Sequence, residues 1–429
     1  MSGHYGIVET VTEPRLPRVL RPFRSGQYRL LIGALSLSIF GSGMWLVAIV
    51  FQVKALGGGP VDLSFVATGN ALGLVAAVLI GGVAADRIPQ KRILIAVEIG
   101  KFAAVAVVAA LALAGSLEIW HLAVASLVLG VADGFFYPAY SAMLPSILPA
   151  EDLLAANGFE GVLRPAVMQA AGPAIASTII AAYSPAWVFV IIAVALALGA
   201  GVLTFLRLTA VRRELEPSDA HPIAKVFSDL RGGFAYMVRT PWLLATLLFA
   251  CIIVMLIMGP IEVLLPFAVT EQTGGGPLEF AMALAAFGLG GVIGSLAIAS
   301  RRLPRRYLTL MNLLWGAGSV PLAVIGFTGH LWVMIVALFI VGFAFQAATV
   351  IWGTLLQRRV PPELLGRVSS LDFFVSLALM PVSMALAGPV GELVGRGPTF
   401  FVAGVVPVFI AAIAIVAARM PRDEIENPL

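Results

Sequence analysis

Two acidic residues lie deep inside apolar stretches of the chain, where a carboxyl group could bind and release protons. Asp133 is about twelve residues into the fourth long apolar stretch, which is near mid-depth if that stretch crosses a membrane. Glu262 lies in the outer third of the seventh stretch, directly after Gly259-Pro260. Desolvation favours the neutral carboxyl, so such acids load and release protons as their access to water changes. Asp133 is therefore the first proton-coupling candidate and Glu262 the second. The competing interpretations are a structural hydrogen bond for Asp133 and the water interface for Glu262.

Other charged residues in these stretches are spaced to form local contacts. Glu160 and Arg164 are one helical turn apart, which predicts an i,i+4 ion pair or a contact with the turn after the second stretch. Glu98 and Lys101 have the spacing of a structural pair on one helix. Asp372 falls in the first turn of an expected helix, where an acid stabilises the helix dipole, so we expect it to act as a cap.

The composition excludes an ordinary soluble enzyme and indicates a membrane protein. The 429 residues are 60% hydrophobic and 12% charged, whereas globular chains are about 45–50% apolar and about 25% charged. A single cysteine excludes disulfides within the chain and cysteine-based metal sites, and the four histidines show no metal-ligand spacing. The sequence has no GxxxxGK[ST] pattern for a nucleotide-driven pump. We therefore expect no enzymatic activity, no metal and no cofactor.

Twelve apolar stretches are long enough to position these groups across a bilayer, whose core of about 30 Å needs about 20 residues per helix. They run near 28–54, 62–85, 93–115, 121–144, 159–183, 187–206, 242–269, 278–300, 307–327, 331–356, 369–392 and 399–418. The chain is therefore predicted to be an all-α polytopic membrane protein with 12 transmembrane helices.

The basic residues predict the orientation of these helices. If the N-terminus is inside, 23 of the 27 Lys and Arg residues lie at the inner side, and only Lys54 and Arg396 lie at the outer side. The positive-inside rule then places both termini in the cytoplasm and explains the basic pI by topology instead of nucleic-acid binding.

The stretches also define the expected domains. The linker between two six-helix bundles is expected to include an amphipathic helix along the membrane face. The domains are a cytoplasmic tail 1–27, an N-terminal bundle 28–206, a cytoplasmic linker 207–241, a C-terminal bundle 242–418 and a cytoplasmic tail 419–429.

The two halves of the chain repeat each other. A shift of 215 residues brings Gly73 onto Gly288 and Arg87 onto Arg302. Parallel repeats of six helices, with a substrate site between them near the midplane, are one architecture of secondary transporters.

The turn after the second stretch carries the most specific motif. Residues 82–92, GVAADRIPQKR, resemble the major facilitator superfamily signature GxxxD(R/K)xGx(R/K)(R/K), with Pro89 in place of the usual glycine. The resemblance implies the major facilitator fold, two pseudo-symmetric six-helix bundles. It also implies a latch that closes the cytoplasmic side when the aspartate faces the N-terminus of helix 11, where the dipole stabilises an anion. The latch residues are Gly82, Asp86, Arg87, Lys91 and Arg92. A solvated turn that only sets topology is the alternative.

Further strings resemble one exporter branch of that superfamily. They are DGFF at 133–136, LPAEDLLAANG at 148–158 and QRRVPPELLGRV at 357–368. The branch includes macrolide- and tetracycline-type multidrug efflux proteins and the enterobactin exporter. Antiporters of the family carry GPxxGG in helix 5, and this chain retains Gly172 and Pro173 in GPAIAS. The motif favours export, and a packing seam between helices is the alternative.

Uncharged polar and aromatic residues complete the candidate site. Helix 4 lines the central cavity in the family, and broad-specificity sites are mainly apolar and aromatic with a few polar groups. Aromatic residues on membrane helices also often face lipid. The cavity candidates are Asn70, Phe135, Tyr137, Tyr140, Gln169, Asn312, Trp315, Gln346 and Trp352, together with Trp45.

These observations predict proton-coupled secondary active efflux by alternating access, a drug:H+ antiport of amphipathic small molecules such as antibiotics. The protein would act as a monomer in a bacterial cytoplasmic (inner) membrane, with protons, the lipid bilayer and a drug-like molecule or siderophore as partners. A first alternative is export of an endogenous siderophore or metabolite, although the scarcity of deep basic residues leans toward neutral or cationic drugs. A second alternative is a non-transporting membrane sensor with a transporter fold.

Overall fold

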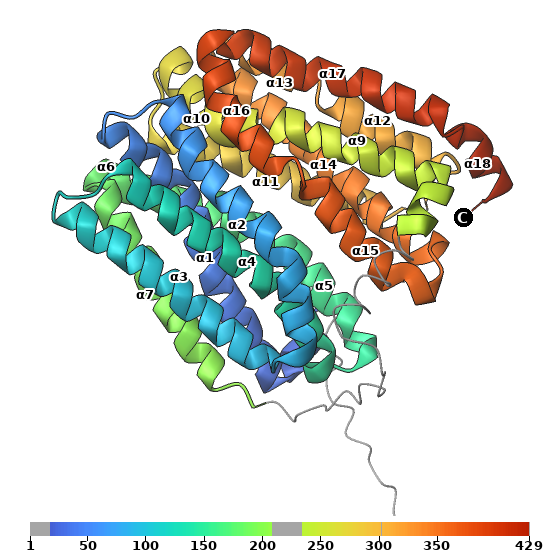
Figure 1. Cartoon of the computed structure of the whole chain (residues 1–429), viewed down its shortest axis with the longest axis horizontal. Helices are drawn as coiled ribbons and strands as arrows, with labels where there is room; N and C mark the ends of the chain where they lie inside the picture. Colours follow the sequence, from blue (N-terminus) through green and yellow to red (C-terminus); the bar gives the residue numbers. More distant parts are fainter. Residues whose placement is uncertain (1–17, 208–233, 302, 429) are drawn as a thin grey trace, which may run out of the picture.

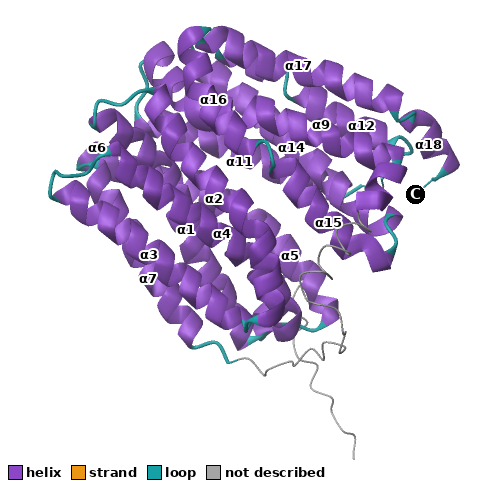
Figure 2. Ribbon diagram, in the orientation of Figure 1, coloured by secondary structure: helices purple, strands orange, loops and turns teal. Residues whose placement is uncertain are grey.

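The computed structural model describes residues 18–207, 234–301 and 303–428, and the regular elements in these ranges are all helices (Figure 1; Figure 2). Twelve helical spans among the described residues are long and apolar enough to cross a membrane. Their bounds lie close to the predicted ones: the stretch expected near 28–54 is Gly26–Ala55, and the stretch near 331–356 is Leu331–Arg359. The predicted all-α polytopic fold is confirmed.

The N-terminal bundle contains the first six spans, of which the fifth is built from three consecutive segments. A short 3-10 helix, η1, precedes the first span, and a π-helical segment, η2, separates α5 from α6 in the fifth. The bounds are η1 Arg18–Arg24, α1 Gly26–Ala55, α2 Pro60–Arg87, α3 Gln90–Leu113, α4 Ile119–Ile147, α5 Ala150–Arg164, η2 Pro165–Ala171, α6 Gly172–Ala182 and α7 Pro185–Thr204.

The C-terminal bundle contains the other six spans. The seventh span runs from α9 through two π-helical segments, η3 and η4, the ninth combines α12 with α13, and most of the eleventh is formed by α15 and α16. The bounds are α9 Pro241–Gly259, η3 Pro260–Leu264, α10 Leu265–Phe267, η4 Ala268–Gln272, α11 Pro277–Ala299, α12 Tyr307–Gly318, α13 Leu322–Ile325, α14 Leu331–Arg359, α15 Pro362–Leu377, α16 Met380–Leu393, α17 Arg396–Ala417 and α18 Met420–Glu426.

The segments outside the two bundles differ in how much of them the structure describes. Residues 1–17 of the expected tail 1–27, and residues 208–233 of the expected linker with its amphipathic helix, lie outside the described residues. The expected tail 419–429 contains a packed helix, α18. Glu424 of α18 is buried and accepts hydrogen bonds from Thr309 N at 2.7 Å and Thr309 Oγ1 at 3.0 Å. The carboxylate thus caps the N-terminal end of α12, which explains why this segment packs on the bundle.

The same pair of helices packs closely in each bundle. A Cβ atom on Gly130 of α4 would collide with the carbonyl oxygen of Asn70 on α2, and one on Gly342 of α14 would collide with the carbonyl oxygen of Phe287 on α11. Only glycine permits such contact between helix backbones, and small residues are typical of membrane helix interfaces. The second and fourth spans of each bundle therefore share one packing solution, in agreement with the sequence repeat.

Hydrogen bonds between the two bundles gather at one end of the molecule. Here the end that carries Arg24, Arg87 and Arg359 is called the basic end, and the other is called the opposite end. Among the described residues, the side-chain hydrogen bonds between bundles all lie at the opposite end. They are Lys54 Nζ to Thr270 Oγ1 at 2.6 Å, Ser177 Oγ to the carbonyl of Pro277 at 2.9 Å and Gly388 N to Ser64 Oγ at 2.7 Å. Figure 1 correspondingly shows the bundles converging near α6 and α10 and diverging toward α5 and α15.

Candidate functional site

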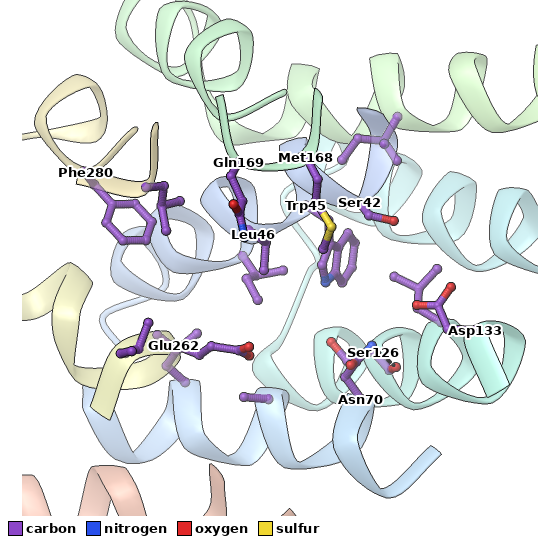
Figure 3. Close-up of a pocket in the computed structure, with 18 of the residues that line it drawn as sticks. Ser42, Trp45, Leu46, Asn70, Ser126, Asp133, Met168, Gln169, Glu262 and Phe280 are labelled. Carbon is purple, nitrogen blue, oxygen red and sulfur yellow. Dashed lines mark hydrogen bonds between the residues drawn. The ribbon is translucent and has the colours of Figure 1, made fainter. Parts of the chain in front are cut away.

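A cavity of about 300 Å³ lies between the bundles, and its lining residues on α1, α2 and α11 lie in the halves of these helices nearer the opposite end. Most of its wall comes from the N-terminal bundle, from α1, α2, α3, α4, η2 and α7, and the facing wall comes mainly from η3 and α11. The wall is largely apolar and includes Trp45 and Phe280 (Figure 3). Its polar residues are Ser42, Asn70, Lys101, Ser126, Asp133, Gln169 and Glu262. An apolar space with a few separate polar groups suits small amphipathic ligands.

Two π-helical segments place side chains on this cavity. The missing N–H groups of Pro165 and Pro260, at the starts of η2 and η3, interrupt the α-helical hydrogen bonding. The wider π turn that follows is closed by a bond from Gly172 N to Val167 O in the fifth span and from Leu265 N to Pro260 O in the seventh. Segments of this kind occur frequently at functional sites. Here they carry Gln169 and Glu262, respectively, on the cavity wall.

Glu262 is an unpaired carboxylate in the cavity wall. Its side chain extends into the space between the bundles (Figure 3) and retains an exposed surface there. Within the described residues, the carboxylate makes no hydrogen bond and no ion pair, and the neighbouring wall residues Met258, Ile261 and Leu265 are apolar. A lone carboxylate beside apolar surface attracts a cation, because no protein charge compensates it.

Asp133 occupies the other side of the cavity and is paired with Lys101. Asp133 of α4 is 25% exposed, and its Oδ1 atom lies 2.5 Å from Nζ of the nearly buried Lys101 on α3. The predicted local pair of Glu98 with Lys101 is therefore wrong: the ammonium reaches across to α4 and its ion pair is with Asp133. The same ammonium lies 5.1 Å from the ring centroid of Phe136, so an aromatic face covers the pair.

Glu98 lies behind this ion pair in the interior of the N-terminal bundle. It is completely buried, and its Oε1 atom accepts a hydrogen bond of 2.7 Å from Ser38 Oγ on α1. Lys101 Nζ also contacts Ser38 Oγ at 3.4 Å, so the hydroxyl lies between the ammonium and Glu98. The second carboxyl oxygen, Oε2, has no hydrogen-bond partner in the structure. Two acids and one base thus form one cluster at the cavity wall.

Tyr137 of α4, one helical turn closer to the basic end than Asp133, forms a second polar group with Glu160 and Arg164 of α5. The predicted pair of Glu160 with Arg164 is confirmed, with Oε1 and Nη2 2.5 Å apart. The guanidinium also lies 4.8 Å from the ring centroid of Tyr137 and donates to its hydroxyl at 3.3 Å. Tyr137 is therefore held inside the N-terminal bundle and does not line the cavity.

Asn70 and Gln169 are the uncharged polar candidates that the structure brings to the cavity, and Trp45 also lines it. The Nδ2 atom of Asn70 lies 3.4 Å from the carbonyl oxygen of Ser126. The side chain of Gln169 lies against Gly288 of α11, where a Cβ atom would be 2.8 Å from Oε1. These two amides therefore lie at helix contacts as well as on the cavity.

The other predicted cavity residues lie elsewhere. Phe135 lines an apolar groove between α2, α3 and α4, and Tyr140 is buried in the N-terminal bundle. In the C-terminal bundle, Asn312 donates to Leu308 O at 2.9 Å, and the side chain of Gln346 lies against Gly291. Trp315 and Trp352 are buried and have ring centroids 6.3 Å apart. Apart from Phe135, these side chains pack within their own bundles, and residue type alone does not reveal this.

Asp372 does not cap a helix. The helix that contains it begins at Pro362, so Asp372 lies well inside α15. Its carboxylate accepts hydrogen bonds from Trp352 Nε1 at 2.9 Å and from Ser376 Oγ at 3.1 Å. The expectation of a cap was wrong because the apolar stretch starts later than the helix does, and the polar first turns precede the membrane span.

The latch motif lies at the turn between α2 and α3. The side chain of Asp86 lies outside the described part of the structure, whereas Arg87 and Arg92 are exposed. Lys91 donates to the carbonyl oxygens of Thr204 at 2.8 Å and Leu206 at 2.6 Å, and so satisfies the C-terminal end of α7. Gly82 has open space where a Cβ atom would be. The helix α2 contacts α15 and α16 of the other bundle, and its hydrogen bond with α16 lies at the start of α2, away from the motif, where Gly388 N donates to Ser64 Oγ.

The Gly172-Pro173 motif lies at a close contact between the first and fifth spans. A Cβ atom on Gly172 would be 3.0 Å from Met44 N and 3.0 Å from Phe40 O. Both motif residues are buried. The motif therefore packs the first span against the fifth, as expected from its alternative interpretation as a packing seam.

Lys101 and Ser38 also belong to the site, although neither was predicted there. One signal was available for Lys101: it lies in the middle of an apolar stretch, at a depth similar to that of Asp133. A cation in that place needs an anionic partner from a neighbouring helix. Ser38 gave no such signal, since serines are common in membrane helices.

Comparison with known proteins identifies similar chains over almost the whole length. The family model described as Major Facilitator Superfamily matches residues 31–382. An uncharacterised MFS-type transporter, YfiS of Bacillus subtilis, is 27% identical, with 92% of this chain and 93% of that protein covered. The multidrug efflux pump Tap of Mycolicibacterium fortuitum is 27% identical, with coverage of 89% and 93%. Macrolide efflux protein A of Streptococcus pyogenes is 22% identical, with coverage of 88% and 92%.

Solved structures show the same fold at low sequence identity. The nucleoside transporter NupG superposes with a TM-score of 0.71 at 10% identity, covering 90% of this chain and 99% of that one. A POT family transporter in complex with 5-aminolevulinic acid superposes with a TM-score of 0.70 at 14% identity, covering 91% and 96%.

Proposed function

Because this chain belongs to the Major Facilitator Superfamily, and is thus a membrane transporter and not an enzyme, we propose that it exports amphipathic small molecules such as antibiotics in exchange for protons. Its relatives named as efflux proteins support the direction of transport. The observation that carries the proposal is the cavity between the bundles, where the carboxylate of Glu262 faces apolar and aromatic surface and has no partner within the described part of the chain.

The cavity favours neutral or cationic cargo over an anionic siderophore. Among the described residues that line it, Lys101 is the single basic side chain, and its ammonium is already engaged by Asp133. An anionic group would therefore meet Glu262 without a free cation to compensate it, and the repulsion between like charges disfavours such cargo. A cationic amphipath meets a free carboxylate and an aromatic wall instead.

Transport would follow from rocking of the two bundles about the cavity. The hydrogen bonds at the opposite end, such as Lys54 to Thr270, would break as that end opens to the exterior. At the basic end, Asp86 would face the N-terminus of α15, which begins at Pro362, and so latch the cytoplasmic side. We propose that the protein is a monomer in a bacterial inner membrane. Both termini would be cytoplasmic, because the basic residues gather at one end of the spans and the positive-inside rule assigns that end to the cytoplasm.

Asp133 and Glu262 are the proposed acids for proton coupling. Both line the cavity, so both gain or lose access to water with each swing of the bundles. A proton bound from the exterior would displace the cargo, and its release toward the cytoplasm would allow the next molecule to bind. Uphill export then fails when the coupling acid cannot titrate, while exchange of one molecule for another continues.

The test uses inverted membrane vesicles with an imposed pH gradient and a fluorescent pH probe. Tetracyclines, macrolides, cationic dyes and siderophores are added in turn to wild-type, Asp133→Asn, Glu262→Gln and Glu426→Gln vesicles. Glu426 is the matched control, because it is an exposed acid paired with Arg422 far from the cavity. A cargo-triggered proton leak in wild type and in Glu426→Gln, but not in Asp133→Asn, supports the proposal. No leak with any compound in correctly inserted wild-type protein contradicts it and favours a non-transporting sensor.

A further inference from the structure

The cluster behind the cavity wall contains more acid than base. Glu98 and Asp133 can each carry one negative charge, and Lys101 carries one positive charge. Glu98 is fully buried and Lys101 is nearly so, and an isolated charge in such a place is costly. One proton on the cluster makes it neutral, and two acids are available to hold it.

The geometry shows which acid is compensated by the ammonium in this conformation. Lys101 Nζ lies against Asp133, while Glu98 has only the hydroxyl of Ser38, with its Oε2 atom unpartnered. Among the described residues, Lys101 and Asp133 are the charged groups that act on Glu98, and the other elements packed around it supply no further charge. Gly199 of α7 lies beside Oε2, where a Cβ atom would be 3.5 Å from the oxygen. On α4, the next polar group is Tyr137, which is bound to Arg164.

We propose that Glu98 stores the coupling proton and that Lys101 controls its delivery to Asp133 by changing partners. Glu98 and Lys101 are three residues apart on α3, so their side chains lie on one face of the helix. The ammonium can therefore turn from Asp133 to Glu98 without any movement of the backbone. Asp133 lines the cavity and Glu98 does not, so the change moves the proton from a place without access to water to one with it.

The transfer is balanced within four side chains. The ammonium of Lys101 gives one proton to Asp133 and becomes an amine, and the hydroxyl of Ser38 gives its proton to that amine. The O–H bond of Glu98 breaks as its proton replaces the one that Ser38 lost. A new O–H bond forms on Asp133, the ammonium keeps three N–H bonds, and it ends beside the carboxylate of Glu98. The contacts for this path are present, since Ser38 Oγ lies 2.7 Å from Glu98 Oε1 and 3.4 Å from Lys101 Nζ. Both hydrogen bonds reverse direction during the transfer: Ser38 then accepts from the Glu98 carboxyl and donates to the Lys101 amine. A cationic cargo in the cavity then displaces the proton from Asp133.

This assignment deepens the proposed function and rests on it for its role in transport, but the position of the proton can be measured without any cargo. The measurement is the infrared carbonyl-stretch band of a protonated carboxylic acid, recorded at neutral pH on purified full-length protein. All variants carry Glu262→Gln, so that the unpaired acid of the cavity does not contribute.

The expected result is that the parent protein shows a protonated-carboxyl band that is lost in two different variants. Glu98→Gln removes the group that holds the proton. Asp133→Asn also removes the band, because Lys101 then pairs with Glu98 and the cluster is neutral without a proton. Glu426→Gln leaves the band unchanged. A band that persists in Glu98→Gln overturns the assignment, and a band lost in Glu98→Gln but kept in Asp133→Asn shows a permanently neutral Glu98 and overturns the exchange of partners.

Ser38→Ala provides a variant that keeps all three ionisable groups and so carries little risk of misfolding. Loss of the hydroxyl donor to Oε1 is expected to move the band to the frequency of a carbonyl without that hydrogen bond, and a band that does not move contradicts the relay. The vesicle experiment separates the two proposals. If wild-type vesicles show no cargo-driven proton flux while the infrared pattern is as expected, the export function fails and the location of the proton stands.

Discussion

The ammonium of Lys101 on α3 lies 2.5 Å from the Oδ1 atom of Asp133 on α4, with Lys101 4% exposed and Asp133 25% exposed. The pair joins two helices of the N-terminal bundle at the cavity wall and neutralises the carboxylate that the sequence singles out first. The charge balance of the site therefore depends on α3, the helix that carries Lys101.

Replacing Lys101 by methionine is expected to destabilise the protein by about 3–5 kcal/mol, because it leaves a buried partner charge uncompensated. The double variant Lys101→Met with Asp133→Asn should recover most of this loss, since both charges are then absent. Thermal unfolding in detergent of wild type, both single variants and the double variant forms the cycle that isolates the pair. Additive effects of the two single changes would show that the two side chains do not interact.

Replacing Glu262 by glutamine is expected to weaken binding of cationic cargo by about tenfold to about a hundredfold, from about 1.5–3 kcal/mol for a lost interaction with a charged group. Binding of a neutral antibiotic should change little, because glutamine keeps the shape and polarity of the side chain. Titration of purified protein with a fluorescent monovalent cationic dye, and with chloramphenicol as the neutral compound, measures both affinities. Equal losses for the two compounds would contradict a role of the charge.

Most of the fold follows from the sequence because membrane-spanning helices depend on one simple property, a long run of apolar residues. The bounds of the sixth span, expected at 187–206 and found at Pro185–Thr204, illustrate this. The beginning of α15 was harder to predict, because its first turns are polar and leave no hydropathy signal. For the same reason Asp372 was wrongly predicted to lie in the first turn of its helix.

The site was only partly predictable, because the direction of a side chain around its helix axis depends on tertiary packing. Asp133, Glu262, Asn70 and Gln169 line the cavity, whereas Trp315 and Trp352 pack against each other inside the C-terminal bundle. All six are polar or aromatic residues in apolar stretches, so residue type does not distinguish those that line the cavity from those inside a bundle. The π-helical turns that carry Gln169 and Glu262 also change the helical phase, and their proline positions were the only sign of this.

A covalent cross-link between positions 54 and 270 is expected to stop transport. Lys54 Nζ donates to Thr270 Oγ1 at 2.6 Å and lies 5.2 Å from the ring centroid of Phe267, so α1 is held against the seventh span at the opposite end. The pair Lys54→Cys with Thr270→Cys, in a chain whose native Cys251 is changed to serine, should be cross-linked by a short bifunctional thiol reagent. Export in vesicles measures the effect. Full export after complete cross-linking would show that this end does not open, and each single cysteine variant treated with the same reagent is the control.

Replacing Gly130 by alanine is expected to prevent stable folding of the N-terminal bundle. The added methyl group would collide with the backbone oxygen of Asn70, which cannot move away without shifting α2. Gly201→Ala on α7 is the matched control, because a Cβ atom there meets nothing within 4 Å. Alanine also favours a helix over glycine by roughly 1 kcal/mol, so the control should be at least as stable as wild type. Yield of monodisperse protein and its unfolding temperature distinguish the two variants. If Gly130→Ala behaved like Gly201→Ala, the close contact of α2 with α4 would not be what fixes these helices together, and the matching contact of Gly342 with Phe287 in the other bundle would lose the same role.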